Sequence, residues 1–323
     1  MFLQYDNLLI TWEKDLQTSV YTGCSTRKEF VIIVSEFFNK EQKMDNLFNS
    51  PAEVIEGNIC GGEKKVNLPL SKMILLGIMA GAFIALGGAT SSTPAHAITN
   101  VGVSRFVAGA IFPVGLMLIT FIGGELFTGN CLTAMGAMDH RFSWGKVARD
   151  LAIIWVSNLI GALIIVALTY FSGNLDYSGG LLGAYSIKVA LGKATISPIK
   201  GVTSGILCNI LVCAAILMGA AAKDIGGKVW AIFFPIMAFV VGGFEHCVAN
   251  MFYIPMGIFA AHNDAYVAKA AEAYGITADQ LAQLDIAGFI TNQIPVTIGN
   301  ILGGMVFVGL PCFLAHCKKC NNK

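Results

Sequence analysis

His246 is the side chain best suited to proton chemistry in this sequence. It is one of five histidines and the only one deep inside an apolar segment, residues 227–261. Imidazole titrates near neutral pH, so it can act as a switch or as a proton donor. An ionisable group inside a membrane is costly and usually functional, although a neutral core histidine bonded to a backbone carbonyl is the simpler alternative. We predict that His246 lines a pore.

Two carboxylates occupy matching places in two long apolar segments. Glu125 and Glu245 each stand just after a glycine pair, and a Phe-Pro pair lies near the start of each segment. A carboxylate there could bind a cation or relay protons. It could also accept hydrogen bonds from backbone that is broken inside the membrane, where every polar group needs a partner. We predict the second role, so that Glu125 and Glu245 support two interrupted helices.

Three uncharged polar side chains lie in the same apolar surroundings. Thr128 follows the first glycine pair, where its hydroxyl could cap a half-helix or contact a ligand. The N-terminal end of such a half-helix favours anions. Asn250 lies one helical turn beyond His246 and shares its face, which favours a common lining. Asn209 could line the pore or join two helices by hydrogen bonds.

Bulky residues near these positions could narrow a pore, because apolar constrictions gate by dewetting. The candidates are Phe112, Leu116, Phe127 and Phe239. From spacing alone, helix packing is the simpler interpretation of each. Lys193 is expected in the outer loop between the third and fourth apolar segments, where a solvated lysine is ordinary. A cation at a pore mouth could also concentrate anions.

The elements that must position these residues are six apolar segments. Hydrophobic residues make up 55% of the 323 positions and charged residues 13%, whereas soluble domains carry about a quarter charged residues. A net charge of +1 excludes a strongly basic nucleic-acid binder. A span needs about 20 apolar residues. Candidate spans cover 69–92, 104–139, 147–173, 200–222, 227–261 and 286–316. The second and fifth are too long for one helix, so each is expected to form two half-helices.

The two halves of the apolar region look like copies of each other. The run Asn-Leu-Ile-Gly at 158–161 echoes Asn-Ile-Leu-Gly at 300–303. Three spans per copy require the second copy to be inverted in the membrane. Eleven lysines and arginines flank the spans on the side of the N-terminus and five on the other side, so the positive-inside rule predicts that both termini are cytoplasmic.

The domain organisation follows from the same pattern. Residues 1–66 form a polar N-terminal segment, of which 1–43 could be an extension ahead of Met44. Residues 67–317 form the six-span transmembrane domain, and 318–323 form a cytoplasmic tail.

The chain resembles the formate/nitrite transporter family and is most similar to its hydrosulfide-channel branch. The resemblance runs from about Ser50 to Ala315. It rests on the motifs at 50–54, 68–70, 123–128, 205–209, 243–246 and 294–300. It implies an all-α, aquaporin-like fold with six transmembrane helices, inverted three-helix repeats and broken second and fifth helices. It also implies one pore per protomer and a homopentamer in the inner or plasma membrane, surrounded by lipid.

The resemblance also implies roles for single residues. Thr128 would lie in the loop that interrupts the second helix, and His246 would be the central pore histidine. Asn209 and Asn250 would be its polar neighbours, the four bulky residues would form the constrictions, and Lys193 would stand in the outer vestibule. The implied substrates are small anions of weak acids. Hydrosulfide comes first and formate and nitrite next, with His246 assisting protonation.

Other classes of protein remain as alternatives. A channel for water or glycerol would share the architecture, but the paired Asn-Pro-Ala motifs of aquaporins are absent. An ammonium channel is disfavoured because only one histidine lies in the pore. A membrane enzyme or metal protein would need clustered ligands, and only the tail, with Cys317 and Cys320, offers any. We expect no enzyme activity, no metal and no cofactor.

Overall fold

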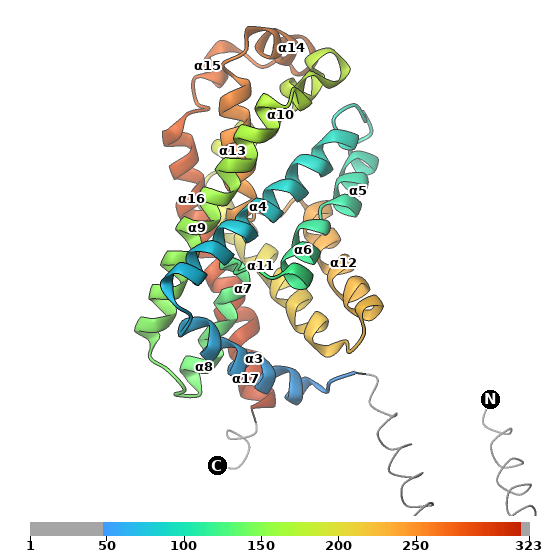
Figure 1. Ribbon diagram of the computed structural model, residues 1–323. Coiled ribbons are helices and arrows are strands. Elements are labelled where there is room, and N and C mark those ends of the chain that lie inside the picture. The colour runs from blue at the N-terminus through green and yellow to red at the C-terminus, as the bar shows by residue number, and fades with distance from the viewer. Residues whose placement is uncertain (1–47, 318–323) are drawn as a thin grey trace, which may run out of the picture. The chain divides into compact units, whose positions relative to one another are not determined.

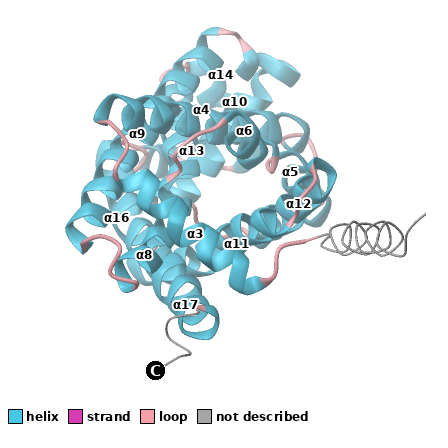
Figure 2. Cartoon of the chain, turned by 60° about the horizontal axis from the view of Figure 1, so that its bottom comes forward, coloured by secondary structure: helices cyan, strands magenta, loops and turns pink. Residues whose placement is uncertain are grey.

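The structure, a computed structural model, describes residues 48–317. Residues 49–317 belong to one compact unit, whose elements are helices joined by short turns (Figures 1 and 2). The expectations for an extension at 1–43 and a tail at 318–323 concern residues outside the described range. We call the end of the unit that carries α3, α8 and α17 the proximal end, and the end with α14 and α15 the distal end (Figure 1).

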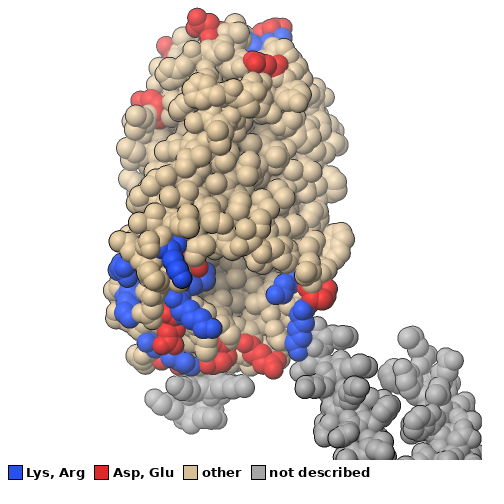
Figure 3. Space-filling view, in the orientation of Figure 1, with Lys and Arg blue, Asp and Glu red and all other residues tan. Residues whose placement is uncertain are grey.

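Six helical segments are long and apolar enough to cross a membrane. They are Leu70–Ala95 (α4), Val101–Ile122 (α5 and α6), Trp144–Phe171 (α9), Pro198–Ala221 (α11), Ile225–Gly242 (α12) and Ile286–His316 (α16, η3 and α17). Four of these segments agree with the predicted spans to within a few residues, whereas the second and fifth predicted spans, 104–139 and 227–261, also cover the helices that follow each interruption. On the face in Figure 3, charged side chains gather at the two ends, and the broad belt between them is uncharged. The chain is a multi-pass membrane protein.

The remaining helices lie outside these six segments or complete them. They are α3 (Pro51–Val66), α7 (Phe127–Asn130), η1 (Cys131–Thr133), α8 (Ala134–Met138), η2 (Asn174–Asp176), α10 (Tyr177–Ala194), α13 (Cys247–Ala260), α14 (Asp264–Tyr274) and α15 (Ala278–Leu281). Within the sixth span, η3 (Gly303–Gly309) is a π-helix, a form often found at functional sites.

The second and fifth spans are interrupted, as predicted. α6 (Val114–Ile122) ends at Gly123, whose φ is 105°, and helix resumes at Phe127. α12 ends at Gly243, whose φ is 69°, and α13 begins at Cys247. Glycine reaches positive φ without a Cβ clash. The glycines therefore allow the chain to leave the helix in mid-membrane.

Asn158 in α9 holds the first interruption. Its Oδ1 accepts the backbone N–H of Phe127 at 2.9 Å. Its Nδ2 donates to the carbonyl oxygens of Gly77 at 2.7 Å and Glu125 at 2.9 Å. Asn158 is fully buried, so this one amide partners both sides of the break where water cannot.

Asn300 in α16 holds the second interruption in the same way. Its Oδ1 accepts the N–H of Cys247 at 2.9 Å, and its Nδ2 donates to Gly205 O at 2.8 Å and Glu245 O at 3.0 Å. Every partner is the counterpart of one of Asn158's partners. The two halves are therefore inverted repeats, which confirms the fold class predicted from the Asn-containing echo.

Candidate functional site

Two cavities open from opposite ends of the unit toward the interrupted helices. The distal vestibule, about 740 Å³, is lined by Lys193, Glu245 and His246 among others. The proximal vestibule, about 420 Å³, is lined by residues that include Lys65 and Leu116. Both reach the level of the breaks. The arrangement is that of a path through the membrane with a barrier in the middle.

The barrier on the distal side consists of two phenylalanines and the histidine. The ring centroids of Phe112 and Phe239 are 5.5 Å apart in edge-to-face geometry, and Phe239 lies 5.8 Å from the His246 ring. All three side chains are buried and line the distal vestibule. Leu116 lines the proximal vestibule instead. Phe127 is buried and is absent from the linings of both vestibules.

His246 is both a barrier residue and the N-cap of α13. Its Nδ1 accepts the backbone N–H of Ala249 at 3.0 Å. A ring nitrogen that accepts carries no proton, so the proton of the neutral imidazole is on Nε2. Nε2 lies 2.9 Å from Thr128 Oγ1 and donates to it. The Thr128 hydroxyl keeps its own proton as a donor for a further acceptor.

The distal carboxylate is held in a cluster of buried polar groups. Lys193 Nζ lies 3.0 Å from Glu245 Oε1, and Asn250 Nδ2 donates to Glu245 Oε2 at 2.6 Å. Asn250 Nδ2 also lies 2.9 Å from Asn292 Oδ1. Asn250 Oδ1 is buried without a hydrogen-bond partner among the described residues. It is an acceptor at the vestibule lining whose expected donor is a substrate or water.

The sequence predicts Lys193 in a loop, and the structure shows that this prediction is wrong. Lys193 stands in the last turn of α10, a helix that packs against α13, and its side chain is only 18% exposed. The carboxylates also differ from expectation. The buried asparagines, not Glu125 and Glu245, accept the free N–H groups at Phe127 and Cys247, while each carboxylate pairs with a lysine.

A second cluster at the proximal break mirrors the distal one. Lys65 Nζ lies 2.8 Å from both Glu125 Oε2 and Asn130 Oδ1. Asn130 Nδ2 donates to Asp150 Oδ2 at 2.9 Å. Lys65, Asn130 and Asp150 were not among the candidates. For Lys65 the sequence does carry a signal, because Lys65 precedes Gly77 by twelve residues, as Lys193 precedes Gly205.

Asn209 contacts backbone rather than a cavity. Its Nδ2 donates to Asn300 O at 2.6 Å and to Thr128 O at 3.2 Å. It is fully buried and is absent from the linings of both vestibules. These bonds tie α11 to the first interruption and so hold Thr128 in place.

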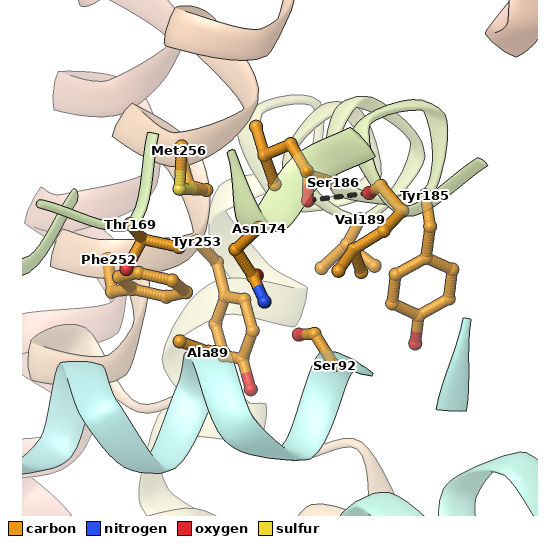
Figure 4. Close-up of a pocket in the computed structure, with 12 residues that line it drawn as sticks. Ala89, Ser92, Thr169, Asn174, Tyr185, Ser186, Val189, Phe252, Tyr253 and Met256 are labelled. Atoms are coloured by element: carbon orange, nitrogen blue, oxygen red, sulfur yellow. Dashed lines mark hydrogen bonds between the residues drawn. The ribbon is translucent and has the colours of Figure 1, made fainter. Parts of the chain in front are cut away.

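A third cavity lies beside the distal vestibule but is too small for a substrate. Figure 4 shows it between Phe252 and Tyr253 of α13 and Tyr185 and Ser186 of α10. Its volume is about 10 Å³, near the lower limit for a single water. The candidate site is therefore the pair of vestibules and the barrier between them.

Comparisons with known proteins agree with this geometry. The sequence model of a family described as formate/nitrite transporter matches residues 52–314. A probable formate transporter of Methanothermobacter thermautotrophicus is 37% identical over 85% of this chain and 100% of its own. The formate channel FocA of Escherichia coli (strain K12) is 34% identical over 86% of this chain and 98% of its own.

Two solved structures have the same fold. One, described as an FNT family ion channel, is 30% identical, with a TM-score of 0.70 over 81% of this chain and 98% of its own. The other, a pentameric formate channel with formate bound, is 33% identical, with a TM-score of 0.67 over 76% of this chain and 97% of its own.

Proposed function

The chain belongs to the formate/nitrite transporter family, and on this premise we propose that each protomer conducts small monovalent anions of weak acids. The observation that carries the proposal is the pair of vestibules that face each other across Phe112, Phe239 and His246. Formate becomes the leading substrate, because curated relatives and a solved neighbour are named for it. Hydrosulfide, placed first on sequence resemblance, and nitrite remain candidates.

The barrier admits the substrate best as a neutral acid. A bare anion at mid-membrane costs several kcal/mol or more, and the phenylalanine pair offers it no hydrogen bond. We propose that the anion is drawn to Lys193, gains a proton near His246 and Thr128, crosses as the acid and releases the proton beyond the barrier. The net movement is one anion and one proton.

The orphaned oxygen of Asn250 supports the passage of an acid. It needs a donor, and formic or nitrous acid has an O–H to offer, whereas formate and nitrite have none. The Thr128 hydroxyl supplies the complementary donor for the other oxygen of formic acid. Asn250 lies within one turn of His246, so the two contacts could be made at the same barrier.

Substitutions of Thr128 should distinguish the role of its hydroxyl group from the role of its side-chain volume. Thr128→Val keeps the volume but leaves the Nε2–H of His246 without its acceptor, so formate flux is expected to fall about tenfold or more. Thr128→Ser retains the hydroxyl and should keep most of the flux. The measurement is formate uptake into proteoliposomes. Equal flux in the valine and serine variants would remove Thr128 from the mechanism.

A flux panel tests the proposed function itself. Proteoliposomes would be offered formate, nitrite, hydrosulfide and glycerol between pH 5 and 8. Anion uptake should rise as pH falls, because the protonated fraction of a weak acid grows about tenfold per pH unit above its pKa. Glycerol or water flux without anion flux would instead support the neutral-solute alternative. Protein-free liposomes supply the background for the free acid.

We further propose a homopentamer in the inner or plasma membrane with both termini cytoplasmic. The solved neighbour described as a pentameric channel supports the assembly. Exposed aromatic residues on α12, including Trp230 and Phe234, offer apolar surface to lipid or to another protomer. The excess of cationic residues at the flanks of the proximal end supports the orientation. Residues 67–317 would form the conducting domain, with α3 adding Lys65 to it, and no enzyme activity, metal or cofactor is proposed.

A further inference from the structure

The distal vestibule contains two cations beyond Lys193. Arg105 and Lys188 both line it. The charge of Lys193 is matched by Glu245 at 3.0 Å. Among the described residues, no carboxylate lies within ion-pair distance of Arg105 or Lys188. Lys188 lies over the Tyr274 ring, 4.4 Å from its centroid. The lining therefore has an excess of two positive charges.

Arg105 lies directly over the second interruption. A Cβ built on Gly243 would stand 2.3 Å from Arg105 Nη1, 3.1 Å from Cζ and 3.2 Å from Nη2. The whole planar end of the side chain thus covers Gly243, which precedes Glu245 and His246 by only a few residues. Any side chain at 243 would displace the guanidinium. Gly243 therefore has two roles. It leaves room for the Arg105 guanidinium, and it adopts the positive φ at which the helix breaks.

The inverted repeat does not reproduce these two cations at the proximal side. Lys188 of α10 corresponds to Cys60 of α3, in the register that pairs Lys193 with Lys65. Aligned through the two Phe-Pro pairs, Arg105 corresponds to Gly227. Lys65 is the one cation among the described residues that line the proximal vestibule, and its charge is matched by Glu125. The vestibules share one lysine site but differ in net charge.

We propose that Arg105, assisted by Lys188, is a carboxylate-binding station in the distal vestibule that has no proximal equivalent. The inference rests on the proposed function and names the class of anion that the distal side captures best. A guanidinium presents two parallel N–H donors that match the two oxygens of a carboxylate such as formate. The unneutralised charge in a cavity also raises the local anion concentration. The distal face should therefore saturate at a lower formate concentration than the proximal face.

The test compares half-saturation at the two faces. Initial rates of radiolabelled formate uptake would be measured over a range of formate concentrations, with the full-length protein in right-side-out and in inside-out vesicles. In Arg105→Gln, the half-saturating formate concentration at the distal face should rise about fivefold at low ionic strength and less in high salt. At the proximal face it should stay unchanged. At equilibrium a passive pathway carries equal fluxes in both directions, whatever binding sites it contains. The direction of net flux therefore cannot reveal a site on one face, whereas the half-saturating concentration at each face can.

Two further variants sharpen the result. Arg105→Lys keeps the charge but loses the fork, so it should weaken formate binding while leaving half-saturation for hydrosulfide unchanged. Lys200→Gln removes an exposed cation from the first turn of α11, outside the vestibule lining, and should change neither face. If Arg105→Gln shifts the half-saturating formate concentration equally at both faces, or at neither, the proposed carboxylate-binding role of Arg105 is refuted. Wild-type protein without formate uptake above the protein-free background from either face would overturn the proposed function, and this inference with it.

Discussion

Gly161→Val is expected to abolish folded protein. In α9, a Cβ at Gly161 would lie 1.9 Å from the backbone oxygen of Ile78 and 2.8 Å from the nitrogen of Ala82. Both obstacles are backbone of α4, so no side-chain rotation relieves them. The facing Gly81 is equally close, 2.0 Å from Asn158 O. Small residues of this kind let membrane helices approach closely, and α4 and α9 form the most extensive helix pair of the unit.

The energetic cost should exceed ordinary overpacking. Inserting methyl groups into a packed core usually costs about 1–3 kcal/mol. Here the two helices must separate, and the separation also pulls Asn158 from Gly77 and Glu125. That loss approaches the whole stability of a typical domain, about 5–15 kcal/mol. Size-exclusion chromatography in detergent should give aggregate in place of a single peak.

Gly61→Ala is the matched control for that experiment. A Cβ at Gly61, in the middle of α3, meets no atom within 4 Å. Alanine in a helix interior is favoured over glycine by about 0.5–1 kcal/mol, so the variant should unfold at the same temperature or slightly higher. A Gly161→Val protein that runs and melts like Gly61→Ala would show that the α4–α9 contact is not required.

The membrane architecture was predictable because its determinants are local and repeated. Span length follows from runs of apolar residues, and the two interruptions follow from glycine pairs beside lone glutamates. The echo of Asn158 in Asn300 identified the inverted repeat, and the structure shows why the echo exists, since each amide holds one broken helix. These features depend on residue type and on spacing along one segment.

The polar clusters were only half predicted, because they join segments that are distant in the chain. The sequence predicts Lys193 in a loop, because α10 is not among the apolar spans that mark the other long helices. Lys65 was missed because α3 lies in a segment that is polar overall. The correspondence of α3 with α10 becomes visible only once the structure shows that Asn158 and Asn300 bond to Gly77 and Gly205. These two glycines set the register in which Lys65 corresponds to Lys193. The tautomer of His246 likewise depends on its hydrogen bond from the backbone N–H of Ala249. This bond cannot be predicted from the pattern of side chains in the sequence.

The largest effect on transport is expected from His246→Asn. Asparagine is among the best N-cap residues, so its side chain can replace Nδ1 as the acceptor for Ala249 and α13 should stay intact. It cannot hold or pass a proton as imidazole does. Loss of a general acid–base group costs about 10²–10⁴ in rate, so formate flux should fall at least about a hundredfold. The remaining flux should follow the concentration of free formic acid, as in protein-free liposomes.

His246→Phe separates the two roles of the histidine. It removes the cap as well as the imidazole, and loss of a cap costs about 1 kcal/mol, which should lower the melting temperature by about 2–4 °C. The asparagine variant should melt like the wild type, while both lose flux. Proton transfer from the ring also requires Nδ1 to gain a proton, which breaks its bond from Ala249, so charging the histidine must loosen the first turn of α13. Wild-type flux with unchanged pH dependence in His246→Asn would refute proton assistance and leave the ring as a cap and a neutral wall of the barrier.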